Sequence, residues 1–192
     1  MSSTELIKQL RDETGVSIMQ CKKALEEADG NIEQAKVNLR KISAQVAAKK
    51  ADRELGSGVV QAYIHAGNSV AGVVVLACET DFVAKNEEFI KIAYDIAMHV
   101  AAIAPEFLSR KEVTEESTKA AKAVFEKEAA DKPEDMREKI VEGKMNSFLK
   151  EKVLLEQDFV KDSSLTIQGL IDEASQKFGE RVEIAEISRF AV

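Results

Sequence analysis

The chain has 192 residues, of which 45% are hydrophobic and 32% are charged, and its formal net charge is −7. This composition is typical of a folded, soluble protein with a substantial apolar core, and the length suffices for a small domain followed by a larger one. The negative charge argues against a general nucleic-acid binder.

Nothing in the sequence indicates a membrane or secretory protein. No apolar stretch approaches the roughly 20 residues that a membrane-spanning helix needs. Residues 1–5 lack the basic and apolar regions of a signal peptide. Cys21 and Cys78 cannot form a disulfide framework and have no metal-ligand spacing, so we expect a reducing, cytoplasmic compartment with both thiols packed as small apolar groups.

Residues 4–50 are predicted to form three short helices, because their apolar residues recur at helical spacing. Thr14 and Gly15 end the first helix, Ser17 caps the second and Asn31 caps the third. A unit of about 40 residues buries little surface. We therefore expect residues 1–55 to be a docking domain with a linker, attached to a larger core of residues 56–192.

The core is predicted to be α+β, with a small antiparallel sheet covered by helices. Two β-prone runs, residues 59–65 and 70–78, flank a turn signal and predict a hairpin. The β-prone tail of residues 182–190 is expected to pair with that hairpin. Helical patterns lie between them, at about residues 89–103, 115–130, 136–149 and 166–178.

An acid and a large aromatic residue stand side by side soon after the apolar run of residues 73–78: Asp81 and Phe82. Burial favours phenylalanine and penalises aspartate, so one of the two is expected to project toward a partner. The alternative is local. Asp81 or Thr80 would cap the following helix, and Phe82 would pack against its first turn.

The motifs of common catalytic sites are missing. The sequence has no glycine-rich phosphate loop, no Ser/His/Asp or Cys/His arrangement and no His-Glu-x-x-His motif. His65 is expected at the hairpin tip, and His99 as a packed or surface residue of a helix. We therefore expect a protein that is not an enzyme and that uses no metal or cofactor.

Six basic residues follow one another with Asp52 as the one acid in their stretch; they are Lys36, Arg40, Lys41, Lys49, Lys50 and Arg53. Such a run is usually the solvated face of a helix. The minority interpretation of the run is a contact with an acidic partner or with RNA. For the function of the chain, two alternatives stay open: binding of RNA or the ribosome, and a protein-interaction adaptor that uses the three-helix domain. Salt-dependent RNA binding would favour the first alternative.

Two segments together resemble the elongation factor Ts family, whose members exchange nucleotide on elongation factor Tu. They are LRDETGVSIMQCKKAL at residues 10–25 and CETDFVAKN at residues 78–86. Residues 97–102, 138–143 and 154–160 are also similar to the family, so the resemblance covers nearly the whole chain. The motifs usually have Asp where this chain has Gln20 and Asn where it has Ala77.

The resemblance implies a set of contacts with the GTPase elongation factor Tu. Asp81 and Phe82, flanked by Thr80 and Val83, match residues that insert beside switch II and disturb the magnesium and phosphate site. Four residues match positions that press on the nucleotide-binding domain: Arg11, Ile18, Met19 and Lys22. Further contact positions are His65 and Phe178.

The resemblance also implies an architecture. Residues 1–55 correspond to a domain of ubiquitin-associated type. The length corresponds to the short form, without the second core subdomain and coiled-coil insertion of longer members. Short forms are associated with dimers, so the resemblance implies dimerisation through the core, with no direct nucleic-acid contact.

Overall fold

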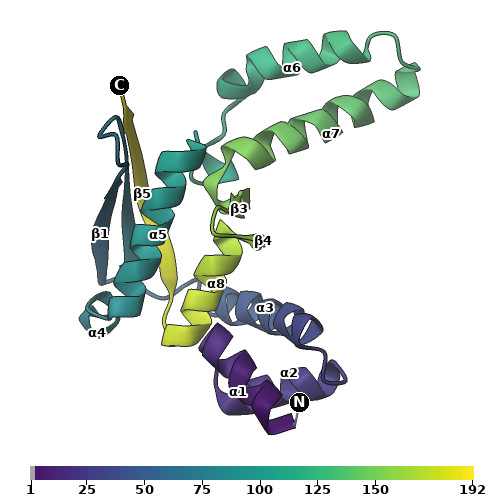
Figure 1. Ribbon diagram of the computed structural model, residues 1–192. Coiled ribbons are helices and arrows are strands. Elements are labelled where there is room, and N and C mark those ends of the chain that lie inside the picture. Colours follow the sequence, from purple (N-terminus) through teal and green to yellow (C-terminus); the bar gives the residue numbers. More distant parts are fainter. Residues whose placement is uncertain (1–2) are drawn as a thin grey trace. The chain divides into compact units, whose positions relative to one another are not determined.

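The structure is a computed structural model that describes residues 3–192 (Figure 1). Its helices in that range are α1 (Ser3–Thr14), α2 (Ile18–Glu27), α3 (Ile32–Ala48), α4 (Asp81–Ala84), α5 (Glu87–Ile103), α6 (Glu115–Ala129), α7 (Glu134–Lys152) and α8 (Ile167–Phe178). The strands are β1 (Ser57–Ile64), β2 (Val70–Cys78), β3 (Asp158–Phe159), β4 (Asp162–Thr166) and β5 (Val182–Ala191). Short 3-10 turns lie at Arg110–Glu112 and Leu154–Glu156.

The main sheet has three strands in the order β1-β2-β5. The predicted hairpin and its pairing with the C-terminal strand are therefore confirmed, as is the α+β class. Strand β2 is central, and its residues Val74, Leu76 and Cys78 are buried at every second position. Strand β5 buries Val182 and Ile184 and then loses the alternation, as the change of phase in the sequence predicted.

The chain forms two compact units, each assembled from separate segments. The first contains the described residues up to Gln61 together with Val74–Asp95 and Gln168–Ala185, and the second contains Ala62–Val73, Ile96–Ile167 and Glu186–Val192. The predicted division between residues 55 and 56 stays a prediction, because these units do not test whether the N-terminal helices fold as a separate domain.

In the first unit, the three N-terminal helices share a small apolar core that includes Leu10, Cys21 and Leu39. The predicted caps are present: the Ser17 hydroxyl accepts the N–H of Gln20, and the Asn31 side chain accepts the N–H of Gln34. Both caps begin their helices where the sequence placed them.

The N-terminal helices are joined to α8 by polar contacts. Arg40 Nε lies 3.2 Å from a carboxylate oxygen of Glu173, and the Ser43 hydroxyl donates to the side chain of Gln176. Lys50 donates to the carbonyl of Gly179, the residue that follows α8. The basic run is thus not simply solvated, because Arg40 and Lys50 hold α3 and its C-terminal end against α8.

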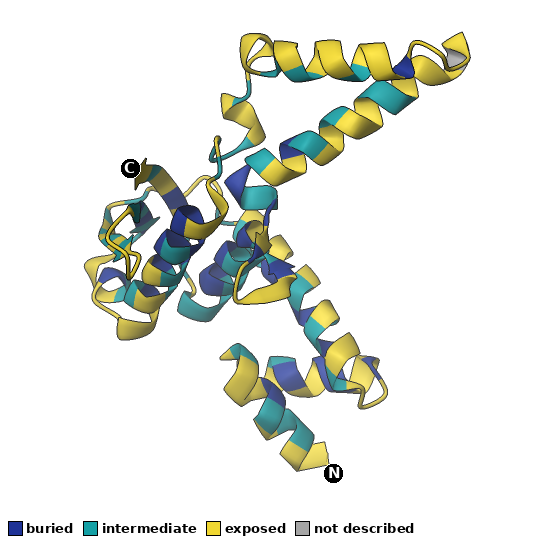
Figure 2. Cartoon of the chain, turned by 45° about the horizontal axis from the view of Figure 1, so that its top comes forward, coloured by how far each residue is buried: buried dark blue, intermediate teal, exposed yellow. Residues whose placement is uncertain are grey.

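In the second unit, β2 and α5 approach each other closely at Gly72. A Cβ atom there would lie 2.2 Å from the carbonyl oxygen of Ala97 and 2.8 Å from the nitrogen of Ala101, so a residue with a side chain does not fit. Figure 2 shows buried residues along α5.

His99 is fully buried in this unit, as the packed alternative predicted. Its Nε2 lies 2.9 Å from Gln157 Oε1, and its Nδ1 accepts the N–H of Val160 at 3.2 Å. Val160 follows β3, whose short antiparallel pairing with β4 was not foreseen from the sequence. This pair is only a few residues long and largely polar, so it gave no period-2 signal.

Helices α6 and α7 lie side by side as a helical hairpin in the same unit (Figure 1). Phe125 and Phe148 meet edge to face, with ring centroids 6.1 Å apart. The two helices confirm the helical patterns predicted at about residues 115–130 and 136–149, and α7 extends slightly beyond the predicted range at both ends. Most residues of the two helices are exposed (Figure 2).

Candidate partner-binding site

Phe82 projects into solvent from the four-residue helix α4, with 84% of its surface exposed. Ala84, two residues on, is buried, and Val83 is half-buried. The helix therefore has an inward side that anchors it and an outward side that carries the ring. The prediction that one residue of the Asp81–Phe82 pair projects is confirmed, and the alternative in which Phe82 packs against the helix is wrong.

Asp81 is also exposed and pairs with Lys85 one helical turn later, with Nζ and Oδ2 2.6 Å apart. The hydrogen bond from Lys85 lowers the pKa of the Asp81 carboxyl below its ordinary value. Asp81 is thus an anion at neutral pH. It lies at the start of the helix, where a negative charge is favourable.

Thr80 occupies the N-cap position of α4 but does not cap with its side chain. Its hydroxyl instead donates to Glu180 Oε1 at 2.6 Å, and its backbone N–H donates to Glu180 Oε2 at 3.0 Å. Its carbonyl accepts the Ala84 N–H and the Cys78 thiol, both at 3.2 Å. Every polar group of Thr80 is engaged, so the segment that carries Phe82 is fixed at its base.

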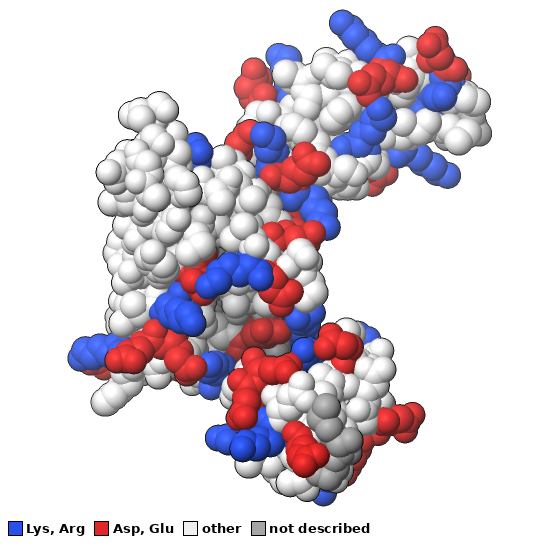
Figure 3. Space-filling model, in the orientation of Figure 1, with Lys and Arg blue, Asp and Glu red and all other residues white. Residues whose placement is uncertain are grey.

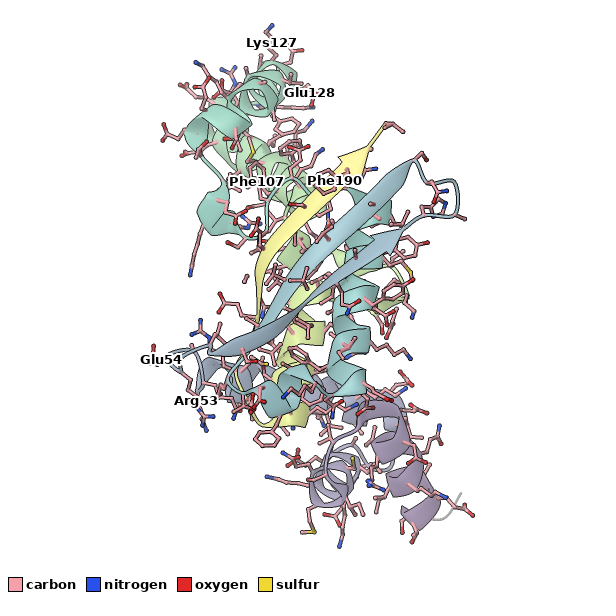
Figure 4. The ribbon with its side chains drawn as sticks, turned by 90° about the vertical axis from the view of Figure 1, so that its left-hand side faces the viewer. Arg53, Glu54, Phe107, Lys127, Glu128 and Phe190 are labelled. Carbon is pink, nitrogen blue, oxygen red and sulfur yellow. The ribbon has the colours of Figure 1, made fainter. Side chains whose placement is uncertain are left out.

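A second carboxylate, that of Glu79, joins the same two strand ends in the opposite direction, from the end of β2 to the start of β5. Glu79 accepts the backbone N–H of Arg181 at 2.5 Å, and Arg53 Nη1 lies 3.1 and 3.3 Å from its two carboxylate oxygens. The Arg181 N–H lowers the pKa of the Glu79 carboxyl, and Arg53 adds to the effect. Arg53 lies in the linker that leads into β1, next to Glu54 (Figure 4). The strand ends 79–80 and 180–181 are therefore joined reciprocally.

Phe178 has an intramolecular partner. It is half-buried, and its ring meets the fully buried ring of Phe89 edge to face, with centroids 5.6 Å apart and planes at 80°. Lys177 beside it pairs with Glu88 at 2.8 Å. These contacts attach the end of α8 to the start of α5, close in the sequence to α4.

The predicted residues of the N-terminal helices are all exposed. Ile18 and Met19 in the first turn of α2 are 55% and 75% exposed, and Arg11 lies on the exposed side of α1. Lys22 forms an exposed pair with Glu26 at 3.7 Å. Two large apolar side chains that the small core does not use are thus available to a partner.

His65 belongs to the second unit. It is exposed at the end of β1, and its Nδ1 lies 3.2 Å from the Tyr63 hydroxyl. The expected position at the hairpin tip is confirmed. The first unit holds all the other predicted contact residues.

Glu79, Glu180 and Arg181 were not predicted as functional residues from the sequence, and Arg53 was noted only as part of the basic run. They are ordinary surface types without a motif, and the pairing of β2 with both β1 and β5 brings them together. Among residues 3–134 and 136–192, no three His, Cys, Asp or Glu side chains gather as metal ligands, and no helix described there is both long and apolar enough to cross a membrane.

Residues 4–192 match the sequence profile of the family described as Elongation factor TS. The chain belongs to the elongation factor Ts family. It is similar over its whole length to the Elongation factor Ts of Thermosipho melanesiensis, at 44% identity over 194 residues, which cover 100% of this chain and 99% of that protein. The Elongation factor Ts of Herpetosiphon aurantiacus is 43% identical, with 99% and 97% covered, and that of Desulforamulus reducens is 45% identical, with 98% and 88% covered.

Membership in the elongation factor Ts family makes the chain a translation elongation factor. One departure from the first family motif has a local explanation here. Gln20 accepts the Ser17 hydroxyl at 2.9 Å through its side chain, while its backbone N–H donates back to that hydroxyl. Gln20 thus completes the cap of α2.

Proposed function

We propose that the protein promotes release of GDP from elongation factor Tu, by inserting Phe82 and Asp81 beside switch II of that GTPase. The observation that carries the proposal is the exposure of Phe82 on a base whose polar groups are all engaged. A large apolar ring without an internal partner gains free energy when another protein covers it. The protein would promote GDP release in the cytoplasm, through binding alone and without covalent chemistry of its own.

The mechanism follows from packing. The phosphates and Mg²⁺ of a bound nucleotide are held by backbone amides and oxygen ligands, whose geometry tolerates little displacement. A ring driven between packed elements moves them in a discrete step, because close-packed interfaces do not deform smoothly. Asp81 arrives as an anion and adds charge-assisted hydrogen bonds to the displaced arrangement.

The required energy is within reach of the proposed contacts. Whatever factor the protein weakens GDP binding by, GDP weakens binding of the protein by the same factor. A thousandfold effect needs about 4 kcal/mol. Full burial of a phenylalanine side chain contributes about 1.5–3 kcal/mol, so Phe82 would supply about half of the coupling.

The exposed Ile18 and Met19 supply a second contact in the proposal. A contact on the N-terminal helices adds affinity without entering the switch region, and its attachment to α8 raises the effective concentration of the first contact. A Met19→Ala variant is therefore expected to need a higher concentration for half-maximal effect while reaching the same maximal rate.

The experiment is stopped-flow release of fluorescent GDP from elongation factor Tu, with the protein varied in concentration. Phe82→Ala is expected to lower the maximal release rate by about 10- to 100-fold, the equivalent of the lost burial. Phe190→Ala is the matched control, because it removes another exposed ring, 62% accessible, from β5 (Figure 4). A maximal rate for Phe82→Ala equal to the wild-type rate would refute the proposal.

Direct RNA binding has less support. Lys36 pairs with Glu13 at 2.7 Å, and Arg40 and Arg53 have carboxylate partners of their own. On the face drawn in Figure 3, acidic and basic side chains alternate over the N-terminal helices. Phosphate binding would have to displace these internal partners.

We also propose that the protein forms homodimers through the core. Val60 and Ile64 support this, because both are exposed on β1, at 64% and 62%, four residues apart and so on one face of the strand. Light scattering after size-exclusion chromatography is expected to give twice the chain mass, and Val60→Lys is expected to give the monomer. A monomeric wild-type protein at all concentrations would refute it.

A further inference from the structure

We propose that Glu180 is a positioning residue for nucleotide exchange: its carboxylate fixes the Thr80–Val83 segment so that Phe82 meets the partner at a defined angle. The inference rests on the proposed function and adds a residue to it. Glu180 does not itself need to touch the GTPase, since it acts through the base of α4.

The geometry is that of an anchor with three attachment points. Glu180 Oε2 accepts the N–H of Glu79 at 3.1 Å and that of Thr80 at 3.0 Å, while Oε1 accepts the Thr80 hydroxyl at 2.6 Å. The two N–H groups come directly after β2, where the ladder of the sheet ends. A single carboxylate therefore takes up the donors that the strand end leaves without strand partners.

The segment depends on this anchor because its own structure is weak. Helix α4 has four residues, fewer than an isolated helix needs to be stable. Phe82 packs too little to fix its own direction, since 84% of its surface is exposed. The direction of the ring is thus inherited from the backbone at Thr80, and that backbone is held by Glu180.

The reciprocal bond from Arg181 to Glu79 makes the anchor resistant to rotation. One contact would allow the strand end to turn about it, whereas two crossing contacts fix both position and orientation. Arg181 is also held by the carbonyl of Arg53, 2.6 Å from Arg181 Nη1. The residue next to Glu180, Arg181, is therefore held in place, and this limits the movement of Glu180 where it binds Thr80.

Two substitutions of Glu180 separate its geometry from its charge. Glu180→Ala removes all three acceptor contacts, and we expect the maximal rate of GDP release to fall by roughly tenfold, the effect of losing hydrogen bonds to a charged group. Glu180→Gln can keep all three, because its oxygen accepts both N–H groups and its amide donates to the Thr80 oxygen. We expect Glu180→Gln to stay within about twofold of wild type.

The kinetic parameter that changes distinguishes positioning from loss of fold. A variant that is partly unfolded lowers the active concentration, which raises the half-saturating concentration and leaves the maximal rate unchanged. Loss of positioning lowers the maximal rate itself. Glu186→Ala is the matched control, because Glu186 is an exposed acid of β5 that takes no part in the hydrogen bonds between Glu180, Thr80, Glu79 and Arg181.

A double-mutant cycle tests whether Glu180 acts through the ring. In a Phe82→Ala background, Glu180→Ala is expected to change the maximal rate by less than about twofold, because no ring is left to position. An equal effect of Glu180→Ala in both backgrounds would overturn the inference, as would a wild-type maximal rate for Glu180→Ala. If Phe82→Ala itself had no effect, the proposed function would fail first, which separates the two failures.

Discussion

The ring of Phe178 stands edge-on to the ring of Phe89, with centroids 5.6 Å apart. Phe178 therefore differs in kind from Phe82, although the family resemblance marks both as contacts of the GTPase. Phe82 has almost all of its surface free, whereas Phe178 is half-buried and shares an internal aromatic pair worth about 0.5–1.5 kcal/mol beyond its area. Phe178 therefore contributes to the stability of the fold, in addition to any contact that it makes with a partner.

Phe178→Ala is accordingly expected to destabilise the chain by about 2–3 kcal/mol, somewhat less than the 3–5 kcal/mol of a fully buried phenylalanine. Phe82→Ala is expected to change the unfolding free energy by less than about 0.5 kcal/mol, as exposed substitutions do. Urea unfolding of both variants makes the comparison. Equal stability of the two variants would show that the Phe89 contact contributes nothing.

Gly72→Ala is expected to destabilise the chain by about 3 kcal/mol, because backbone atoms of α5 occupy the place of the new methyl group. Gly143→Ala is the matched control. Gly143 lies within α7, and among the described residues no atom other than those of its chain neighbours and the nearby helix backbone lies within 4 Å of the place that its Cβ would take, so alanine there is expected to stabilise by about 0.5–1 kcal/mol. Urea unfolding measures both, and a Gly72→Ala chain as stable as wild type would contradict the close approach of β2 and α5.

Acid is expected to weaken the fold through His99. Burial lowers the pKa of this imidazole below its ordinary value of 6.5, outweighing the opposite effect of Gln157. Protonation would also place an N–H on Nδ1 against the N–H of Val160, which now donates to it. Between pH 6.5 and the lower pKa of the folded chain, the unfolded chain binds the proton and the folded chain does not. The unfolding free energy therefore falls as pH falls through this window.

The measurement is urea unfolding at about pH 7.5 and about pH 5.5, on either side of the ordinary histidine pKa, for wild type and for His99→Gln, which has no titrating group at this position. The variant is expected to lose less stability between the two pH values. Equal losses in the two proteins would assign the acid sensitivity to other groups.

Local features were predictable from the sequence. The caps at Ser17 and Asn31 and the left-handed turn at Gly15, with φ 68°, are determined by neighbouring residues, so the three N-terminal helices could be placed. The sequence also indicated that one residue of the Asp81–Phe82 pair projects, because burial favours phenylalanine and penalises aspartate, but it did not decide between an exposed Phe82 and a Phe82 packed on the helix.

Contacts between distant segments were not predictable. Glu180 and Thr80 are 100 residues apart, and no periodic pattern relates them. The basic run gave a similar difficulty, since the partner of Arg40 is Glu173. The sequence shows only which charges are near each residue along the chain, whereas in the fold a basic residue pairs with a carboxylate from a distant segment. Such pairings depend on tertiary packing, which composition and spacing do not encode.

Because Phe82 is almost completely accessible, the requirements of partner binding and of folding are separated at this position. A buried aromatic residue cannot be altered for the sake of a partner without cost to its own chain. Position 82 is free of that conflict, so side chains from alanine through leucine to tryptophan could be compared there on an unaltered scaffold. The size of the side chain at position 82 could then be varied independently of the stability of the fold.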